Sequence, residues 1–124
     1  MIDAEIARIA DALSAVRMPA QPEEYDIHAQ VCLALDDAGL PFEHECRLGP
    51  RCRIDFRVGR VGIEIKKGRP AGAALVKQLR RYLASDALDA VVVVTQRAVR
   101  LPETIAGKPV YSISLNRLWG VALP

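Results

Sequence analysis

Five consecutive apolar residues at positions 90–94 (AVVVV) leave this chain few ways to fold. β-branched residues favour strands, and a strand without polar alternation is covered on both faces, as in the middle of a parallel sheet. The preceding segment, 73–84, places Leu75, Leu79 and Leu83 at helical spacing. A helix between two strands of one sheet forms a right-handed crossover and favours parallel pairing of those strands. We therefore expect an α/β domain with the apolar strand inside its sheet.

Three earlier segments predict antiparallel strands joined by short turns. Residues 42–48, 53–58 and 61–66 alternate apolar and polar side chains, and glycine-containing turns separate them. A further short strand is expected over 110–113, followed by a turn or helix over 115–119 in which the single tryptophan packs. This order predicts a mixed sheet flanked by helices, with an antiparallel three-strand meander and a parallel strand after the crossover helix. Strict alternation puts Phe42, Cys46 and Leu48 on one face of the first strand, and Ile54, Phe56 and Val58 on one face of the second.

Two amphipathic helices precede the strands. Isoleucine, leucine and valine recur at spacings of three and four over residues 3–17, and two prolines end that helix. A second helix starts at Pro22 and ends before Gly39. At 124 residues the chain has the length of a single domain. We expect a core over 22–114 and, over 1–18, an accessory helix that packs on the core or pairs with another copy or a partner protein.

Composition narrows the class of protein. No apolar run approaches the roughly 18 residues that a membrane span requires, and the acidic start is unlike a signal peptide. Cys32, Cys46 and Cys52 form no CxxC pair, which argues against a disulfide scaffold. His44, Cys46 and Cys52 are candidate zinc ligands, but they fall short of the usual four. We expect a cytoplasmic domain without a membrane partner.

Charge is divided unevenly along the chain. Residues 1–46 carry ten acidic and two basic residues, whereas residues 47–81 carry eleven basic residues and only Asp55 and Glu64 as acids. A strongly basic surface attracts polyanions such as nucleic acid, although a solvated charged face is the simpler explanation. Two carboxylates inside a basic field favour a divalent cation that acts on a phosphodiester.

Asp55, Glu64 and Lys66 are expected to lie together. Alternation puts Glu64 and Lys66 on one face of the third strand, and antiparallel pairing brings Asp55 beside them. Adjacent carboxylates repel each other unless a proton or a cation neutralises one of them, and oxygen ligands suit Mg²⁺ or Mn²⁺. A lysine next to such a cation can orient or help deprotonate the attacking water. The alternative is a cluster of cross-strand ion pairs on a solvated sheet face.

The pattern ID-x8-EIK over residues 54–66 resembles the signature of the PD-(D/E)xK nuclease superfamily, whose core runs helix, three strands, helix, strand. The segment QLRRY at 78–82 is similar to the QxxxY motif of its RecB-like branch. His28 lies on the preceding helix, which often supplies a histidine ligand in that branch. Ile54 departs from the proline of the family name. The resemblance covers residues 22–114 and implies a restriction-endonuclease-like core.

The resemblance implies a metal site for Mg²⁺ or Mn²⁺. Asp55 and Glu64 would be metal ligands, joined by the backbone carbonyl of Ile65. His28 would be a further ligand. A hydrogen-bonded helix histidine is the alternative for His28, and Glu24, one turn earlier, is the alternative ligand.

The resemblance also implies roles in catalysis and DNA binding. Lys66 would be the catalytic lysine, and Gln78 and Tyr82 would support the active site or the DNA. As an i,i+4 pair, Gln78 and Tyr82 also fit ordinary exposed helix polarity. Alternation turns Lys67 away from Lys66, towards a role as a phosphate contact. The expected DNA contacts are basic residues around the motifs: Arg51, Arg53, Arg57, Lys67, Arg69, Lys77, Arg80 and Arg81.

The resulting hypothesis is a Mg²⁺-dependent nuclease that hydrolyses DNA phosphodiester bonds. One alternative is a nuclease-fold DNA-binding module of a repair or phage complex with little or no turnover. Another is a structural or dimerisation protein built around residues 3–17. The intact set of Asp55, Glu64 and Lys66 favours the enzyme, because a binding module has no need for two acids in its most basic region.

Overall fold

The structure of the protein, a computed structural model, describes residues 2–16 and 23–115. None of the helices in these two ranges combines the length and apolarity needed to cross a membrane. Pro22 and residues 116–119, including Trp119, lie outside the described ranges. The elements are, in chain order, α1 (Ile2–Leu13), α2 (Glu24–Asp37), β1 (Glu43–Gly49), β2 (Cys52–Val58), β3 (Val61–Lys66), α3 (Gly72–Leu83), β4 (Ala90–Thr95), β5 (Thr104–Ile105) and β6 (Lys108–Ser114).

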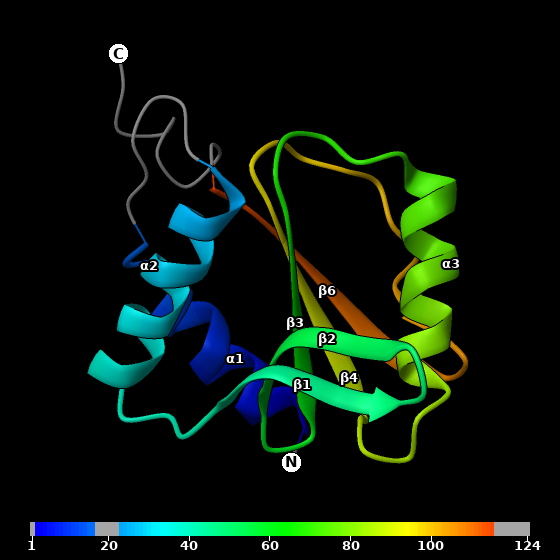
Figure 1. The fold of residues 1–124 in the computed structure, drawn as a ribbon, viewed down its shortest axis with the longest axis horizontal. Coiled ribbons are helices and arrows are strands. Elements are labelled where there is room, and N and C mark those ends of the chain that lie inside the picture. The colour runs from blue at the N-terminus through cyan, green and yellow to red at the C-terminus, as the bar shows by residue number, and fades with distance from the viewer. Residues whose placement is uncertain (1, 17–22, 116–124) are drawn as a thin grey trace.

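The strands form one mixed sheet in the order β1-β2-β3-β4-β6-β5. β1, β2 and β3 pair antiparallel, as the expected meander requires. The crossover helix α3 connects β3 to β4, and these two strands pair parallel. β6 pairs parallel with the other side of β4. Figure 1 shows the sheet with α1 and α2 on one side and α3 on the other. The mixed α/β fold expected from the order of the elements is confirmed.

The apolar strand β4 separates two hydrophobic cores. Val92 and Val94 face a core shared with α1 and α2, which we call the α1/α2 core. Val91 and Val93 face a second core under α3, which we call the α3 core. Every residue of β4 is buried. The strand is therefore covered on both faces, as its sequence predicts.

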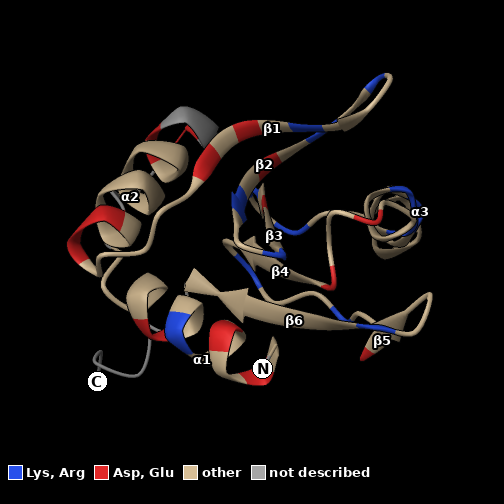
Figure 2. Cartoon of the chain, turned by 90° about the horizontal axis from the view of Figure 1, so that it is seen from below, with Lys and Arg blue, Asp and Glu red and all other residues tan. Residues whose placement is uncertain are grey.

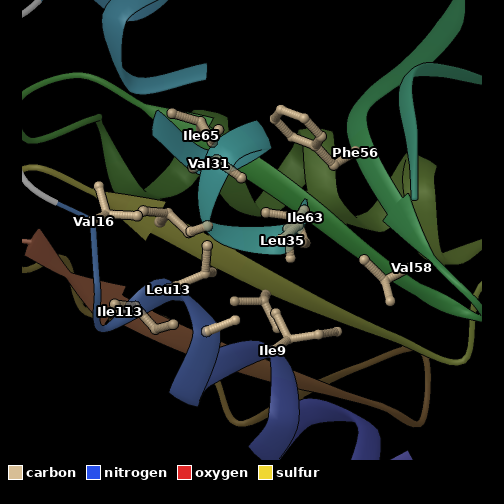
Figure 3. Close-up of a cluster of buried hydrophobic side chains, with 14 of the residues drawn as sticks. Ile9, Leu13, Val16, Val31, Leu35, Phe56, Val58, Ile63, Ile65 and Ile113 are labelled. Carbon is tan, nitrogen blue, oxygen red and sulfur yellow. The ribbon is translucent and has the colours of Figure 1, made fainter. Parts of the chain in front are cut away.

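Helix α1 is part of the α1/α2 core. Ile6, Ile9 and Leu13 are buried there, and Figure 3 shows Ile9 and Leu13 directed at the sheet beneath α2. The helix ends at Leu13 rather than at residue 17, because the next backbone bonds tighten into a three-residue turn and the Ser14 hydroxyl donates to the Asp11 carbonyl (2.6 Å). The apolar stripe therefore packs within its own chain, on the core, which is the first of the two placements expected for it.

In each of the first two strands the buried side chains switch from one face of the sheet to the other, so the single apolar face expected for each strand is wrong. Ile54 reaches the α3 core by packing over Gly62, where an added Cβ would lie 2.5 Å from Ile54 Cδ1 and 2.9 Å from Leu88 Cδ1. The absence of a side chain at Gly62 makes this crossing possible. The predicted face is divided, with Phe42, Phe56 and Val58 at the α1/α2 core and Cys46, Leu48 and Ile54 at the α3 core.

The backbone of Glu45 explains the change of face. Glu45 has a φ of 58° in the middle of β1, a left-handed conformation that is uncommon for any residue except glycine. His44 pairs with Phe56 and Cys46 with Ile54, so the register of β1 and β2 is kept across Glu45, and it shifts further along, between Arg47 and Gly49. The β1–β2 hairpin consequently begins beside α2 and ends on the side of α3, as Figure 2 shows.

Candidate active site

Asp55 lies where β2 and β3 stop pairing. The antiparallel register runs from Val58–Val61 to Phe56–Ile63 and ends there. At the next position, Asp55 Oδ2 accepts a hydrogen bond from the backbone N–H of Ile65 (2.8 Å). The carboxylate thus takes up a main-chain donor at the point where the ladder ends. Asp55 is partly buried at this junction.

Glu64 is the buried acid of the site, with 2% of its surface exposed. Its Oε2 lies 3.1 Å from Lys66 Nζ, on the face of β3 that α3 covers. Its Oε1 is buried and has no hydrogen-bond partner among the described residues. Burial and then the charge of Asp55 raise the pKa of Glu64 to about 7, against the lowering effects of Lys66 and Tyr82. The expected convergence of Asp55, Glu64 and Lys66 is present.

Gln78 and Tyr82 connect α3 to β2. Gln78 Nε2 donates to Tyr82 Oη (2.8 Å), and the Tyr82 hydroxyl donates to the carbonyl of Arg53 (3.2 Å). Tyr82 is buried, and burial together with the neighbouring Glu64 raises its pKa. The alternative of exposed helix polarity is therefore wrong for Tyr82. The pair holds α3 against the strand that carries Asp55.

His28 approaches Asp55 from α2. Its Nε2 lies 3.6 Å from Asp55 Oδ2, and its Nδ1 lies 3.0 Å from His44 Nε2. The two acids therefore receive neighbours from both sides of the sheet, His28 from α2 and Lys66 with Tyr82 from the α3 side. The side chain of Glu24, the alternative ligand, lies outside the described residues.

A second group of metal-ligating side chains was missed by sequence reasoning. Donor atoms of His28, His44 and Glu45 lie within 4.8 Å of one another. Simple alternation would put His44 and Glu45 on opposite faces, but Glu45 has a positive φ and its carboxylate lies 3.8 Å from His44 Nε2. The grouping of His44 with Cys46 and Cys52, which falls short of a zinc site in the sequence, is not formed among the described residues, because both cysteines pack with the α3 core.

The residues at Asp55 and Glu64 fit a hard divalent cation. A buried carboxylate oxygen without a hydrogen-bond partner is costly unless a cation compensates it. Mg²⁺ and Mn²⁺ prefer carboxylate, carbonyl and water oxygens. Asp55, Glu64 and the carbonyl of Ile65 could supply such oxygens, while His28 could add a nitrogen.

Several basic residues of segment 47–81 are neutralised by acids from segment 1–46. Ion pairs join Arg53 to Glu45 (3.2 Å) and Lys67 to Glu23 (3.5 Å). Lys67 is therefore on the α2 side, turned away from Lys66 as alternation predicts. Arg57 is bound by Glu43 at the end of β2 far from the hairpin tip. Arg53, Arg57 and Lys67 are therefore less available to DNA than their sequence suggests.

The remaining expected DNA contacts gather near the hairpin tip and α3. Figure 2 shows lysines and arginines on the outer part of the hairpin and on α3. A pocket of about 330 Å³ at the hairpin tip is lined by Arg47, Arg51, Cys52 and Arg53. Arg81 Nη2 donates to the carbonyl of Arg51 (2.8 Å) and links α3 to this pocket. Among the expected DNA contacts, those that form no ion pair within the described ranges are Arg51, Arg69, Lys77, Arg80 and Arg81.

The site thus joins two carboxylates, a lysine and a histidine from α2, β2 and β3. Tyr82 and Gln78 support it from α3, and an arginine-lined pocket lies at the end of the same hairpin. No family model, no curated protein and no solved structure matches the chain.

Proposed function

We propose that the protein is a divalent-metal-dependent nuclease that hydrolyses DNA phosphodiester bonds at Asp55, Glu64 and Lys66. The observation that carries this proposal is Glu64, a buried carboxylate with one oxygen on Lys66 and the other without a hydrogen bond in the described ranges. A second carboxylate, Asp55, adds negative charge to the same place. Such an arrangement is stabilised by a cation, which suits phosphodiester chemistry.

We also propose that the fold is a restriction-endonuclease-like core. The meander β1–β3, the crossover helix α3 and the parallel strand β4 occur in the order that the resemblance implies. Asp55 on β2 and Glu64 on β3 meet at the point where these strands separate. Helix α2 precedes the meander and brings His28 to Asp55.

Asp55, Glu64 and the carbonyl of Ile65 would hold Mg²⁺ or Mn²⁺. When bound, the cation would act as a Lewis acid that activates water and offsets charge on the phosphate. Lys66 Nζ lies beside Glu64 and is partly exposed, so its ammonium group can donate to a phosphate oxygen or orient the attacking water. Gln78 and Tyr82 are positioning residues, because they act by holding α3 against β2.

DNA binding is assigned to the arginine-lined pocket and the outer face of α3. Arg47, Arg51 and Arg53 line the pocket, and guanidinium groups bind phosphates through paired hydrogen bonds. Arg47 and Arg51 are the guanidinium groups proposed to do so, because Arg53 is paired with Glu45. Arg81 is bonded to the same hairpin and lies one turn of α3 from Lys77. These contacts would position the phosphate backbone without reading sequence.

A DNA-binding module with little or no turnover is the second candidate. The arginine-lined pocket favours it, because this pocket involves none of Asp55, Glu64 and Lys66. Such a module would bind DNA with the same salt dependence as the nuclease but would need no metal.

Incubation of the protein with labelled duplex, single-stranded and branched DNA tests the proposal. We expect cleavage in Mg²⁺ or Mn²⁺ and none in chelator. Binding without cleavage of any of these substrates in either metal would favour the module. Failure to bind any of them at low salt would contradict both.

A further inference from the structure

Two histidines and a glutamate lie together on the α2 side of the hairpin. His28 Nδ1 is 3.0 Å from His44 Nε2, which is 3.8 Å from Glu45 Oε1. One donor atom from each of the three residues lies within 4.8 Å of the other two. Two nitrogens that bind a tetrahedral zinc at about 2.0–2.1 Å are roughly 3.3 Å apart. The three donors are therefore already spaced much like the ligands of one ion.

Neighbouring groups hold two of these donors in place. The ring of His44 stacks on Phe56 at a centroid distance of 4.5 Å. Arg53 Nε holds Glu45 Oε2 at 3.2 Å, while Oε1 is the oxygen that lies 3.8 Å from His44. Metal ligands are commonly oriented by such outer contacts. The left-handed backbone of Glu45, φ 58°, brings its carboxylate to the side of its neighbour.

We propose that His28, His44 and Glu45 bind a first-row transition-metal ion, with Zn²⁺ as the preferred occupant. Imidazole nitrogen suits zinc, whereas Mg²⁺ is bound through oxygen, so this site is distinct from the one at Asp55 and Glu64. His44 and Glu45 are exposed, which gives an ion access from solvent. Three protein ligands leave the fourth tetrahedral position to water. The proposal does not depend on nuclease activity.

Zinc on Nδ1 of His28 defines the role of its second ring nitrogen. Nε2 then carries the ring proton and faces Asp55 Oδ2 at 3.6 Å. A zinc-bound histidine commonly turns its other N–H towards a carboxylate in this way. His28 then belongs to the zinc site, and oxygen ligands from Asp55, Glu64 and Ile65 remain for Mg²⁺.

Titration of the full chain with Zn²⁺ in excess Mg²⁺ tests this site, with Co²⁺ absorption as a second readout of the ligands. We expect one zinc per chain, and His44→Gln and Glu45→Gln should each weaken binding by at least about 100-fold, because each removes a direct ligand. Glu43→Gln is the matched control, since it removes a carboxylate of the same strand that pairs with Arg57 and not with the cluster. It should keep the parent affinity.

Three results would overturn the zinc site. These are unchanged zinc affinity in both ligand variants, displacement of zinc by Mg²⁺, and loss of zinc binding in Glu64→Gln, which would place the ion at the acidic pair. Glu45 is exposed, so Glu45→Gln should fold even if His44→Gln does not, and circular dichroism checks both. A protein that cleaves DNA in Mg²⁺ but never binds Zn²⁺ would contradict this proposal and leave the proposed nuclease intact.

Discussion

Asp55 Oδ2 accepts the backbone N–H of Ile65 at 2.8 Å, one residue beyond the last paired position of β2 and β3. The Asp55 carboxylate therefore replaces a main-chain acceptor for the Ile65 N–H at the point where β2 and β3 stop pairing. This places a carboxylate at the edge of β3 beside Glu64, whose pKa it helps to raise. The two acids are close because the ladder ends between them and not because they pair across it.

Asp55→Asn removes the negative charge of this side chain but keeps an oxygen that can accept a hydrogen bond. The asparagine Oδ1 can still accept the Ile65 N–H, so the melting temperature should change little. Mn²⁺ affinity, measured by titration calorimetry, should fall by at least about 100-fold because a ligand charge is lost. Asp55→Ala is the contrast, since it also removes the hydrogen bond and should cost about 1 kcal/mol of stability. Unchanged Mn²⁺ affinity in both variants would remove Asp55 from the metal site.

Glu64 should make the metal-free protein less stable as the pH rises. Its pKa is about 7 in the fold and near its usual 4.5 in the unfolded chain, so the folded state binds the proton more tightly. Below pH 4.5 both states are protonated and no stability is lost. Stability falls as the pH rises from 4.5 to about 7, and the loss above that range is on the order of 3 kcal/mol.

Glu64→Gln isolates this effect. Asp55, Lys66 and Tyr82 surround the group in both proteins, so the difference between their unfolding free energies reports Glu64. Chemical denaturation from pH 4 to 8 should show that the free energy of unfolding of Glu64→Gln rises relative to that of the parent as the pH increases. Added Mn²⁺ should stabilise the parent and remove this difference. Parallel pH profiles for the two proteins would show that Glu64 titrates normally.

Leu13→Ala tests whether α1 belongs to the core. Leu13 is fully buried between α1 and the sheet, and its truncation should cost about 2–5 kcal/mol. Leu33→Ala is the matched control, because Leu33 on α2 is 57% exposed and its loss should change stability by less than about 0.5 kcal/mol. Chemical denaturation measures both. A cost for Leu13→Ala as small as that for Leu33→Ala would make α1 an accessory helix.

Salt dependence tests the basic surface. DNA affinity should fall with a log–log slope of about −0.9 per phosphate contact on a duplex. Arg80→Ala and Arg81→Ala should weaken binding on all sequences alike and make that slope shallower. Arg57→Ala should leave affinity nearly unchanged, because Arg57 is already paired with Glu43. Fluorescence anisotropy over a salt series distinguishes these outcomes, and equal losses in all three variants would contradict the assignment.

The sequence predicts those parts of the fold where one periodicity dominates. The apolar run of β4 indicates correctly that both of its faces are buried. The alternation over β3 indicates correctly the shared face of Glu64 and Lys66, but not that Gly62 and Glu64 on this face are buried as well. The same alternation is misleading in β1, where a left-handed Glu45 reverses the faces. Residue preferences do not predict a left-handed conformation at Glu45, because glutamate rarely adopts it. His44 and Glu45 were missed as partners for this reason.

Strand β5 was missed for a related reason. It is only two residues long, and the turn that joins it to β6 has positive φ at both Ala106 (54°) and Gly107 (76°). Such turns usually carry asparagine or aspartate before glycine. Because Ala106 stands where asparagine or aspartate is usual, the turn residues do not predict the hairpin of β5 and β6.

Cleavage of labelled DNA by Lys66→Ala in Mn²⁺ tests the nuclease assignment most directly. Lys66 lies 3.1 Å from Glu64 on the α3 side, while its neighbour Lys67 pairs with Glu23 on the α2 side and provides the control. We predict that Lys66→Ala still binds Mn²⁺ and DNA but cleaves roughly 100- to 1,000-fold more slowly than the parent, whereas Lys67→Ala keeps a rate of the parent's order. Equal cleavage by the parent and Lys66→Ala would contradict the proposed active site.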